Sequence, residues 1–229
     1  MPDFTEFEKT IGITFVNKEL LKQAFLHRSY LNENRSVNIE HNERIEFLGD
    51  AVLELVVTDF LFHRFPKQTE GDLTAYRSAL VNTTTLSAVA SSLNMGNYLL
   101  LSKGEARDMG RARQYILANT YEALVGALYL DQGYEGVRGF IERTVLPLID
   151  EIIEKRLWQD HKSLFQEKAQ EKANTTPSYK TLREEGPDHG RHFIVGVFLG
   201  EEQIASGEGM SKQEAEQNAA EKALSVKNW

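Results

Sequence analysis

Residues 42–53 read Asn-Glu-Arg-Ile-Glu-Phe-Leu-Gly-Asp-Ala-Val-Leu, and they place three carboxylates in a segment that is otherwise typical of a buried helix. Asn42 suits the N-cap of that helix, and Glu43 suits its first turn, where a negative charge meets the positive end of the helix dipole. Apolar residues cover most of the circumference: Ile45, Phe47, Leu48, Val52, Leu53, Leu55, Val56, Phe60 and Leu61. The pattern predicts a long, largely buried helix with one narrow polar stripe.

That polar stripe is entirely acidic. Glu43, Glu46 and Asp50 follow one another at i, i+3 and i+7, and Glu54 lies one turn further on. Carboxylates stacked in this way repel each other, and a partly buried one is costly unless a positive group lies beside it. Two interpretations follow: a solvated acidic face on a core helix, or a site for a divalent metal ion.

A second apolar segment, residues 115–130, favours the metal site. Its one ionisable acid is Glu122, and Asn119 precedes it by three residues, so both side chains project from one side of a helix. A glutamate in such surroundings is expected to be neutral, hydrogen-bonded or bound to a cation. Pairing with an arginine such as Arg44 would satisfy it without a metal. Oxygen ligands, with no Cys in the chain and no His in either stripe, favour Mg²⁺ or Mn²⁺ over zinc.

Residues 42–53 resemble the signature of the bacterial ribonuclease III family, and residues 116–123 (Ile-Leu-Ala-Asn-Thr-Tyr-Glu-Ala) resemble its second catalytic helix. A turn at residues 70–73 (Glu-Gly-Asp-Leu) and the stretch 101–105 (Leu-Ser-Lys-Gly-Glu) are similar to further blocks of the family, in the expected order. The likeness covers nearly the whole chain. It implies a multidomain protein, with an all-α endonuclease domain followed by a small α+β domain that binds double-stranded RNA.

Composition limits the alternatives. The 229 residues suffice for one large domain or two ordinary ones, and the absence of Cys suits a reducing cytoplasm. No apolar run reaches the length of a membrane span, and the N-terminus is acidic and polar, so we expect a cytoplasmic protein without a membrane partner. The formal charge of −8 argues by itself against a nucleic-acid partner. That objection weakens if the acids gather at a metal site and on solvent faces.

One basic patch interrupts the acidic background. The loop 103–113 carries Lys103, Arg107, Arg111 and Arg113 against Glu105 and Asp108. We interpret it either as an RNA contact or as an ordinary mobile surface loop.

The helical pattern ends near residue 156. We predict an endonuclease domain over residues 1–156, a short hinge over 157–162 and a second domain over 163–227. The second domain is expected to contain a helix (163–172), three strands (178–184, 192–199 and 203–207) and a final helix to about residue 226, opened by a capping box from Ser211 to Glu214. This α-β-β-β-α order, with Gly-Glu-Gly-Met-Ser-Lys at residues 207–212, resembles a double-stranded RNA-binding domain.

The RNA contacts expected of this domain are to phosphates and 2′-hydroxyls, because A-form RNA hides its base edges in a deep major groove. Ser211 and Lys212 begin the last helix, where N–H donors and a positive charge suit phosphates. The polar residues along one edge of the first helix are Ser163, Gln166, Glu167 and Gln170. They are interpreted as partners of 2′-hydroxyls or as a merely solvated face, and His189 as a contact to the next minor groove. The family often has a second Lys where this chain has Gln213, so we expect a weaker electrostatic attraction to RNA phosphates.

The resemblance implies an endoribonuclease that hydrolyses double-stranded RNA with Mg²⁺, or Mn²⁺ in its place, and needs no small-molecule cofactor. The expected metal ligands are Glu46, Asp50, Asn119 and Glu122. Asp50 and Glu122 are the expected catalytic residues. Products would carry 5′ phosphates and short 3′ overhangs, and the substrates would be ribosomal RNA precursors and other RNAs to be processed. The expected homodimer has both signature helices lining one valley, with Glu43 and Phe47 at its rim or in the dimer contact.

Two points qualify the expected activity. Many family members have Asp where this chain has Asn119, whose neutral carbonyl oxygen can bind a metal directly or through water. Asn also occurs naturally there, so we do not interpret it as inactivating. The alternative function is a dimeric RNA-binding regulator that does not cut. Such a protein has no use for Glu46, Asp50 and Glu122, and their presence favours the enzyme.

Overall fold

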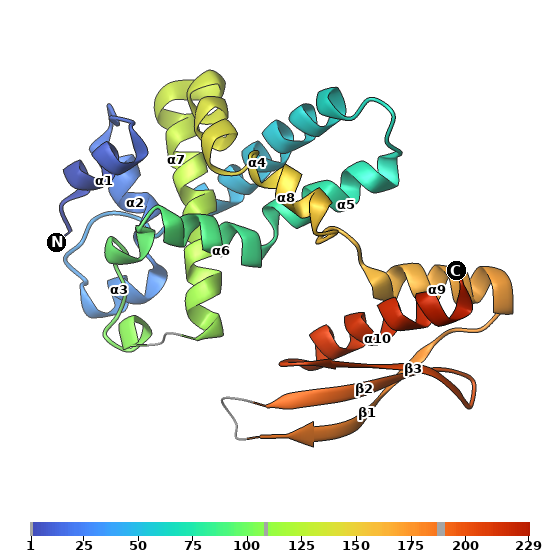
Figure 1. Cartoon of the computed structure of the whole chain (residues 1–229). Helices are drawn as coiled ribbons and strands as arrows, with labels where there is room; N and C mark the ends of the chain where they lie inside the picture. Colours follow the sequence, from blue (N-terminus) through green and yellow to red (C-terminus); the bar gives the residue numbers. More distant parts are fainter. Residues whose placement is uncertain (1, 108–109, 187–190) are drawn as a thin grey trace. The chain divides into compact units, whose positions relative to one another are not determined.

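The computed structural model describes residues 2–107, 110–186 and 191–229, which divide into two compact units, Met1–Trp158 and Gln159–Trp229 (Figure 1). Each unit has a hydrophobic core of its own. Among the described residues, no helix combines the length and the apolar character needed to cross a membrane.

The first unit is helical, as the sequence predicts. Its α-helices are α1 (Phe4–Ile11), α2 (Lys18–Ala24), α3 (Arg28–Glu33), α4 (Glu43–Arg64), α5 (Glu70–Val81), α6 (Thr83–Ser92), α7 (Arg111–Thr144) and α8 (Leu148–Glu154). Two 3₁₀ turns, η1 (Met95–Asn97) and η2 (Glu105–Arg107), precede α7. Residues 70–73, expected as a turn, instead begin α5, where Thr69 and Asp72 form a capping box. The left-handed Gly133, with φ of 75°, divides α7 into two segments.

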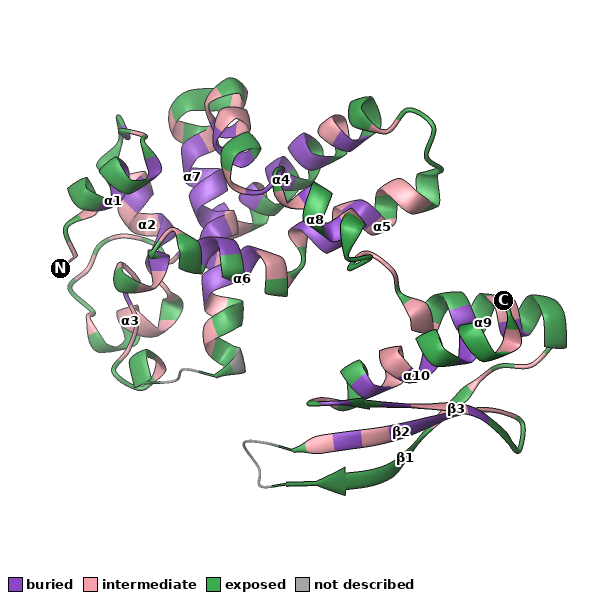
Figure 2. Cartoon of the chain, viewed as in Figure 1, coloured by how far each residue is buried: buried purple, intermediate pink, exposed green. Residues whose placement is uncertain are grey.

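Helices α4 and α7 form the centre of this unit, and Figure 2 shows their buried faces in purple. Fully buried members of the core include Leu53 and Val57 of α4 and Tyr121, Leu124 and Leu128 of α7. Other apolar residues of α4 point outward: Phe47 is 80% exposed, Leu55 57% and Phe62 65%. The sequence-based expectation that Leu55 lies in the buried face is therefore wrong, and α4 has a second apolar face that is exposed among the described residues.

The start of α4 also differs from the prediction. Asn42 occupies the N-cap position, but its side chain makes no capping hydrogen bond. The buried amide nitrogen of Asn42 instead donates to the carbonyl oxygen of Ala24 at 3.1 Å. The Asn42 side chain thus connects the beginning of α4 to the end of α2 and does not cap a free N–H group of its own helix.

The second unit has the predicted order of elements: α9 (His161–Ala173), β1 (Ser178–Glu185), β2 (His192–Leu199), β3 (Glu202–Gly209) and α10 (Lys212–Lys227). The strands form one antiparallel sheet in the order β1-β2-β3. Helix α10 packs against β2, β3 and α9. A methyl group on Gly207 would overlap the backbone of α10, so glycine in β3 permits the close contact between helix and sheet.

Two local details of this unit differ from the predictions. Helix α9 begins at His161, where Asp160 accepts a hydrogen bond from the Ser163 amide, so the helix includes the last two residues of the hinge predicted over 157–162. At α10, Ser211 caps the amide of Glu214 as expected. The second hydrogen bond of the capping box differs from the prediction. The Glu214 carboxylate accepts from the amide of Met210, at 2.7 Å, and not from that of Ser211.

Candidate active site

Two glycines allow α4 and α7 to cross at backbone contact. A methyl group on Gly49 of α4 would overlap the carbonyl group of Glu122, and one on Gly126 of α7 would overlap the carbonyl oxygen of Ile45. Because Gly49 lies between Glu46 and Asp50, the crossing places these acids beside the Glu122 turn of α7. The sequence contained this signal in its Leu-Gly-Asp run, although sequence reasoning assigned the glycine no role.

The carboxylates at the crossing repel one another. Burial raises the pKa of Glu122 to about 8, and the charges of Asp50, Glu46 and Glu54 add to the rise. Burial and the charge of Glu43 also raise the pKa of Glu46, while a hydrogen bond from Asn119 acts in the opposite direction. Asp50 and Glu54 are exposed, whereas Glu46, Asn119 and Glu122 are half-buried. The four predicted metal ligands thus share one electrostatic environment.

Glu46, Asp50 and Glu122 have no cationic protein partner in the described part of the chain. No Lys, Arg or His nitrogen there lies within 4.0 Å of a carboxylate oxygen of Glu46, Asp50 or Glu122. Arg44, the alternative partner of Glu122, instead pairs with Glu40 at 3.3 Å. Among the described residues, no three His, Asp or Glu side chains converge on a single point as metal ligands. The donor set nevertheless suits a hard cation, because it consists of oxygen atoms whose mutual repulsion a cation would relieve.

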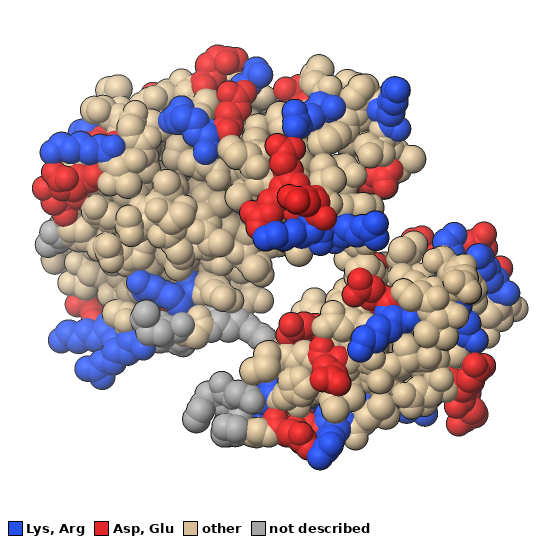
Figure 3. Space-filling model, in the orientation of Figure 1, with Lys and Arg blue, Asp and Glu red and all other residues tan. Residues whose placement is uncertain are grey.

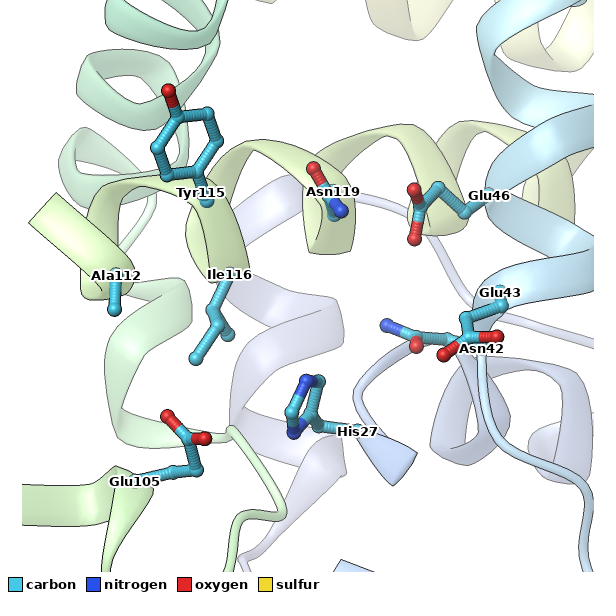
Figure 4. A pocket seen from close by; sticks show the side chains of 9 residues that line it. All are labelled: His27, Asn42, Glu43, Glu46, Glu105, Ala112, Tyr115, Ile116 and Asn119. Atoms are coloured by element: carbon cyan, nitrogen blue, oxygen red, sulfur yellow. The ribbon is translucent and has the colours of Figure 1, made fainter. Parts of the chain in front are cut away.

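A pocket of about 440 Å³ opens beside the crossing, and Figure 4 shows its lining side chains. Glu46 and Asn119 lie on its wall, together with Glu43, which belongs to the first turn of α4. Asp50 and Glu122 do not line this pocket. Glu43 is partly exposed and lies 3.5 Å from Arg28, and its place at the rim of the site or in a dimer contact stays a prediction.

Sequence reasoning gave no role to two residues that line the pocket, His27 and Glu105. His27 precedes α3, and burial lowers the pKa of its imidazole. Glu105 is one of the two acids in the basic loop. The signal that could have identified Glu105 is the block at residues 101–105, which resembles the family without containing an expected ligand, whereas His27 lies in no such block.

The basic loop is only partly free to contact a ligand. Lys103 and Arg107 are exposed, but Arg113 donates to the carbonyl oxygen of Gly96 at 2.9 Å. Asp108 and the side chain of Arg111 lie outside what the structure describes. On the visible face of each unit, basic and acidic side chains lie beside one another (Figure 3).

The predicted RNA contacts of the second unit lie at its surface. Gln166, Glu167 and Gln170 are exposed on α9, and Lys212 is exposed at the start of α10, with its ammonium group 5.7 Å from the ring centre of Phe193. Two of the predicted hydroxyl contacts already have local partners. The hydroxyl group of Ser163 donates to Asp160 at 2.7 Å, and that of Ser211 caps α10. His189 lies outside the described residues.

Comparisons with known proteins agree with both units. A family model described as Ribonuclease-III-like matches residues 17–149, and one described as Double-stranded RNA binding motif matches residues 161–227. The Ribonuclease 3 of Geobacillus kaustophilus (strain HTA426) is 48% identical over 221 residues, 96% of this chain and 89% of that protein. The Ribonuclease 3 of Bacillus cereus (strain AH187) is 47% identical over 96% of this chain and 90% of that protein.

Among solved structures, the nuclease domain of ribonuclease III from Campylobacter jejuni is 38% identical, with a TM-score of 0.57. The match covers 65% of this chain and 97% of that one. That nuclease domain is described as structurally flexible in the region involved in dimer formation.

Proposed function

The chain belongs to the ribonuclease III family of double-strand-specific endoribonucleases, and from this premise we propose that it cuts duplex RNA with Mg²⁺ held between α4 and α7. Glu46, Asp50, Asn119 and Glu122 would hold the ion, with Mn²⁺ as a substitute. The observation that carries the proposal is the position of Glu122, a half-buried carboxylate beside other acids and without a cationic protein partner in the described part of the chain, and this position raises its pKa. A divalent ion would supply the missing positive charge.

When bound, Mg²⁺ would lower the pKa of a water molecule and stabilise the charge that develops on the leaving 3′ oxygen. The chain's own residues prepare the site for it. The amide nitrogen of Asn119 donates to Glu46, which leaves the carbonyl oxygen of Asn119 free to act as a ligand. Asp50 of α4 and Glu122 of α7, whose charges act on each other, would supply the catalytic negative charge. We expect products with 5′ phosphates and short 3′ overhangs, made from ribosomal RNA precursors and other processed RNAs.

We further propose that the enzyme is a homodimer that contacts its partner through α4. Phe47, Leu55 and Phe62 form an outward apolar stripe along that helix, and burial of such a stripe in an interface is favourable. The dimer formation named for the similar Campylobacter jejuni nuclease domain supports a dimer. Sedimentation should give twice the monomer mass at micromolar concentration, and Phe47→Asp should shift it to the monomer. A monomeric parent protein would contradict the shared valley.

In the second unit we propose that Ser211 and Lys212 face phosphates, while Gln166, Glu167 and Gln170 follow a minor groove. Their exposure on α9 and at the start of α10 supports this role. Ser163 would take part only by giving up its hydrogen bond to Asp160. His189 remains a proposed contact from sequence alone.

The decisive test is cleavage of a plain RNA duplex by the purified protein. The parent should cut in Mg²⁺ and stop when the ion is chelated. Glu122→Gln should reduce cleavage at least about a thousandfold while duplex binding changes little, because affinity arises largely from phosphate contacts elsewhere. Glu135→Gln, an exposed change on the same helix, is the matched control and should cut normally. A parent that binds duplex RNA but never cuts it would support the regulator instead.

A further inference from the structure

Two segments far apart in the sequence form one wall of the pocket beside Glu46. Leu26 and Leu100 share a β-bridge, and the amide of Ser102 donates to the hydroxyl oxygen of Ser29 at 3.0 Å. The hydroxyl oxygen of Ser102 in turn accepts from the amide of Glu105 at 3.3 Å. The residues 26–29 and 100–105 are therefore a hydrogen-bonded frame that holds His27 and Glu105 on the same pocket (Figure 4).

This frame selects one tautomer of His27. The Nδ1 atom of His27 accepts from the amide of Ser29 at 3.3 Å and lies 2.8 Å from its hydroxyl oxygen. Because the backbone N–H of Ser29 points at Nδ1, that atom acts as the acceptor, and the Ser29 hydroxyl can donate to it as well. Nδ1 thus carries a lone pair, and the proton of the neutral ring lies on Nε2. Within the described part of the chain, Nε2 makes no hydrogen bond, so the pocket contains a fixed N–H donor without a partner.

The other charged groups of the pocket are acceptors. Glu43, Glu46 and Glu105 contribute carboxylates, and among the described residues no Lys or Arg lines the pocket. Such a wall repels a phosphate. It suits a hydroxyl group, which can donate to a carboxylate and accept from the imidazole N–H at the same time. At about 440 Å³ the pocket lies in the range in which proteins hold small ligands, roughly 300–1,000 Å³.

We propose that this pocket reads the ribose 2′-hydroxyl of a nucleotide next to the scissile phosphate, with His27 Nε2–H donating to the hydroxyl oxygen and the Glu105 carboxylate accepting its hydrogen. The position follows from the shared lining, because Glu46 and Asn119, two of the proposed metal ligands, belong to the same wall. The 2′-hydroxyl distinguishes RNA from DNA, so the subsite would contribute to sugar specificity within the nuclease unit itself. The inference rests on the proposed cleavage site between α4 and α7.

The test pairs protein variants with substrates that lack single 2′-hydroxyl groups. Synthetic duplexes differ only in one 2′-deoxynucleotide, placed at each position beside the scissile phosphate in turn, and single-turnover cleavage is measured in Mg²⁺. The parent should lose about tenfold in rate at one position, the size expected for one hydrogen bond made in the transition state. His27→Ala should lose about tenfold on the all-RNA duplex and less than about threefold more at that position. His27→Gln, which returns an N–H near Nε2, should recover most of the rate.

Glu105→Gln is the second variant, and it tests the proposal even if His27→Ala fails to fold. The change leaves the hydrogen bond from the residue 105 backbone amide to Ser102 in place. It should show the same lack of additivity at the same nucleotide. His63→Ala, on the exposed part of α4, is the matched control and should lose the full tenfold on the deoxy substrate. Fully additive losses for both pocket variants at every position would overturn the subsite while leaving the cleavage function intact. A parent that cannot cut the all-RNA duplex would instead overturn the proposed function.

Discussion

Glu122 in the first unit and Lys212 in the second show how differently the two units place their functional groups. Glu122 is half-buried on a helix that touches the backbone of another helix, and its surroundings raise its pKa to about 8. Lys212 is exposed at a helix end, where its ammonium group lies 5.7 Å from the ring centre of Phe193. The proposed catalytic group is held beside a close contact between two helix backbones, whereas the proposed RNA-binding group is exposed to solvent.

This contrast follows from the chemistry each unit performs. Charges that act on a reacting phosphate must be held in place before the substrate arrives, since reorganisation would cost free energy in the transition state. Phosphate contacts that give affinity are numerous and screened by salt, so each can be modest and adaptable. We therefore expect large, all-or-none effects of mutation in the first unit and small, graded effects in the second.

The largest effect is expected from Gly49→Ala, which would break the contact between α4 and α7. The added methyl group overlaps the Glu122 carbonyl, so the helices must separate and the acids lose their arrangement. Overpacking of this kind costs about 1–3 kcal/mol or more, and each kcal/mol lowers Tm by roughly 2–4 °C in a protein of this size. Cleavage should fall below detection. Calorimetry and a duplex-cutting assay measure the two effects.

Gly71→Ala in α5 is the control for this change, because a methyl group there meets only the Thr69 hydroxyl oxygen, at 3.8 Å. It should leave both activity and Tm near the parent values. If Gly49→Ala melts and cuts like the parent, the close crossing does not position the active site, and the contrast between the units loses its basis.

The Gly49 contact also shows where sequence reasoning reached its limit. Helical periodicity predicted that Glu46 and Asp50 share one helix face and that Asn119 and Glu122 share another. Two such faces with oxygen ligands suggested one shared site. Periodicity could not reveal that Gly49 meets Glu122, since a close approach between two helices depends on tertiary packing. The order of elements in the second unit was also predictable, because hydrophobic periodicity indicates helices and strands and turn residues mark their ends. Asn42 failed as a predicted side-chain cap because the Ala24 carbonyl lay within reach of its amide.

A smaller effect should appear in the pH dependence of stability without metal. The pKa of Glu122 is raised from 4.5 to about 8 on folding, so the folded protein favours the protonated form. The resulting stability is fully present below about pH 4.5 and is lost as the pH rises through about 8. Glu122→Gln keeps the neutral shape at every pH. With a chelator present, its Tm should exceed that of the parent by a few degrees near pH 8.5, and the gap should shrink toward pH 5.

Saturating Mg²⁺ should remove most of this gap at high pH by stabilising the parent alone, because only the parent retains the full ligand set. A Tm difference that stays constant from pH 5 to 8.5 would show that the surroundings of Glu122 do not raise its pKa. The acids would then be a solvated face, and the first unit would resemble the second in its electrostatics.

The smallest effect is expected at the RNA-binding surface. Lys212→Ala should weaken duplex binding by a similar factor of a few for any sequence, because a phosphate contact carries no base information. The slope of log affinity against log salt should shrink by roughly one unit or slightly less, since one fewer contact releases fewer counterions. Gln166→Ala should weaken binding without changing that slope, because an amide in a minor groove displaces no counterion. Titrations of both variants at several salt concentrations separate the two roles. Equal slopes for the parent and both variants would mean that α10 does not face phosphate. The phosphate contacts proposed for this unit would then have to lie on another surface.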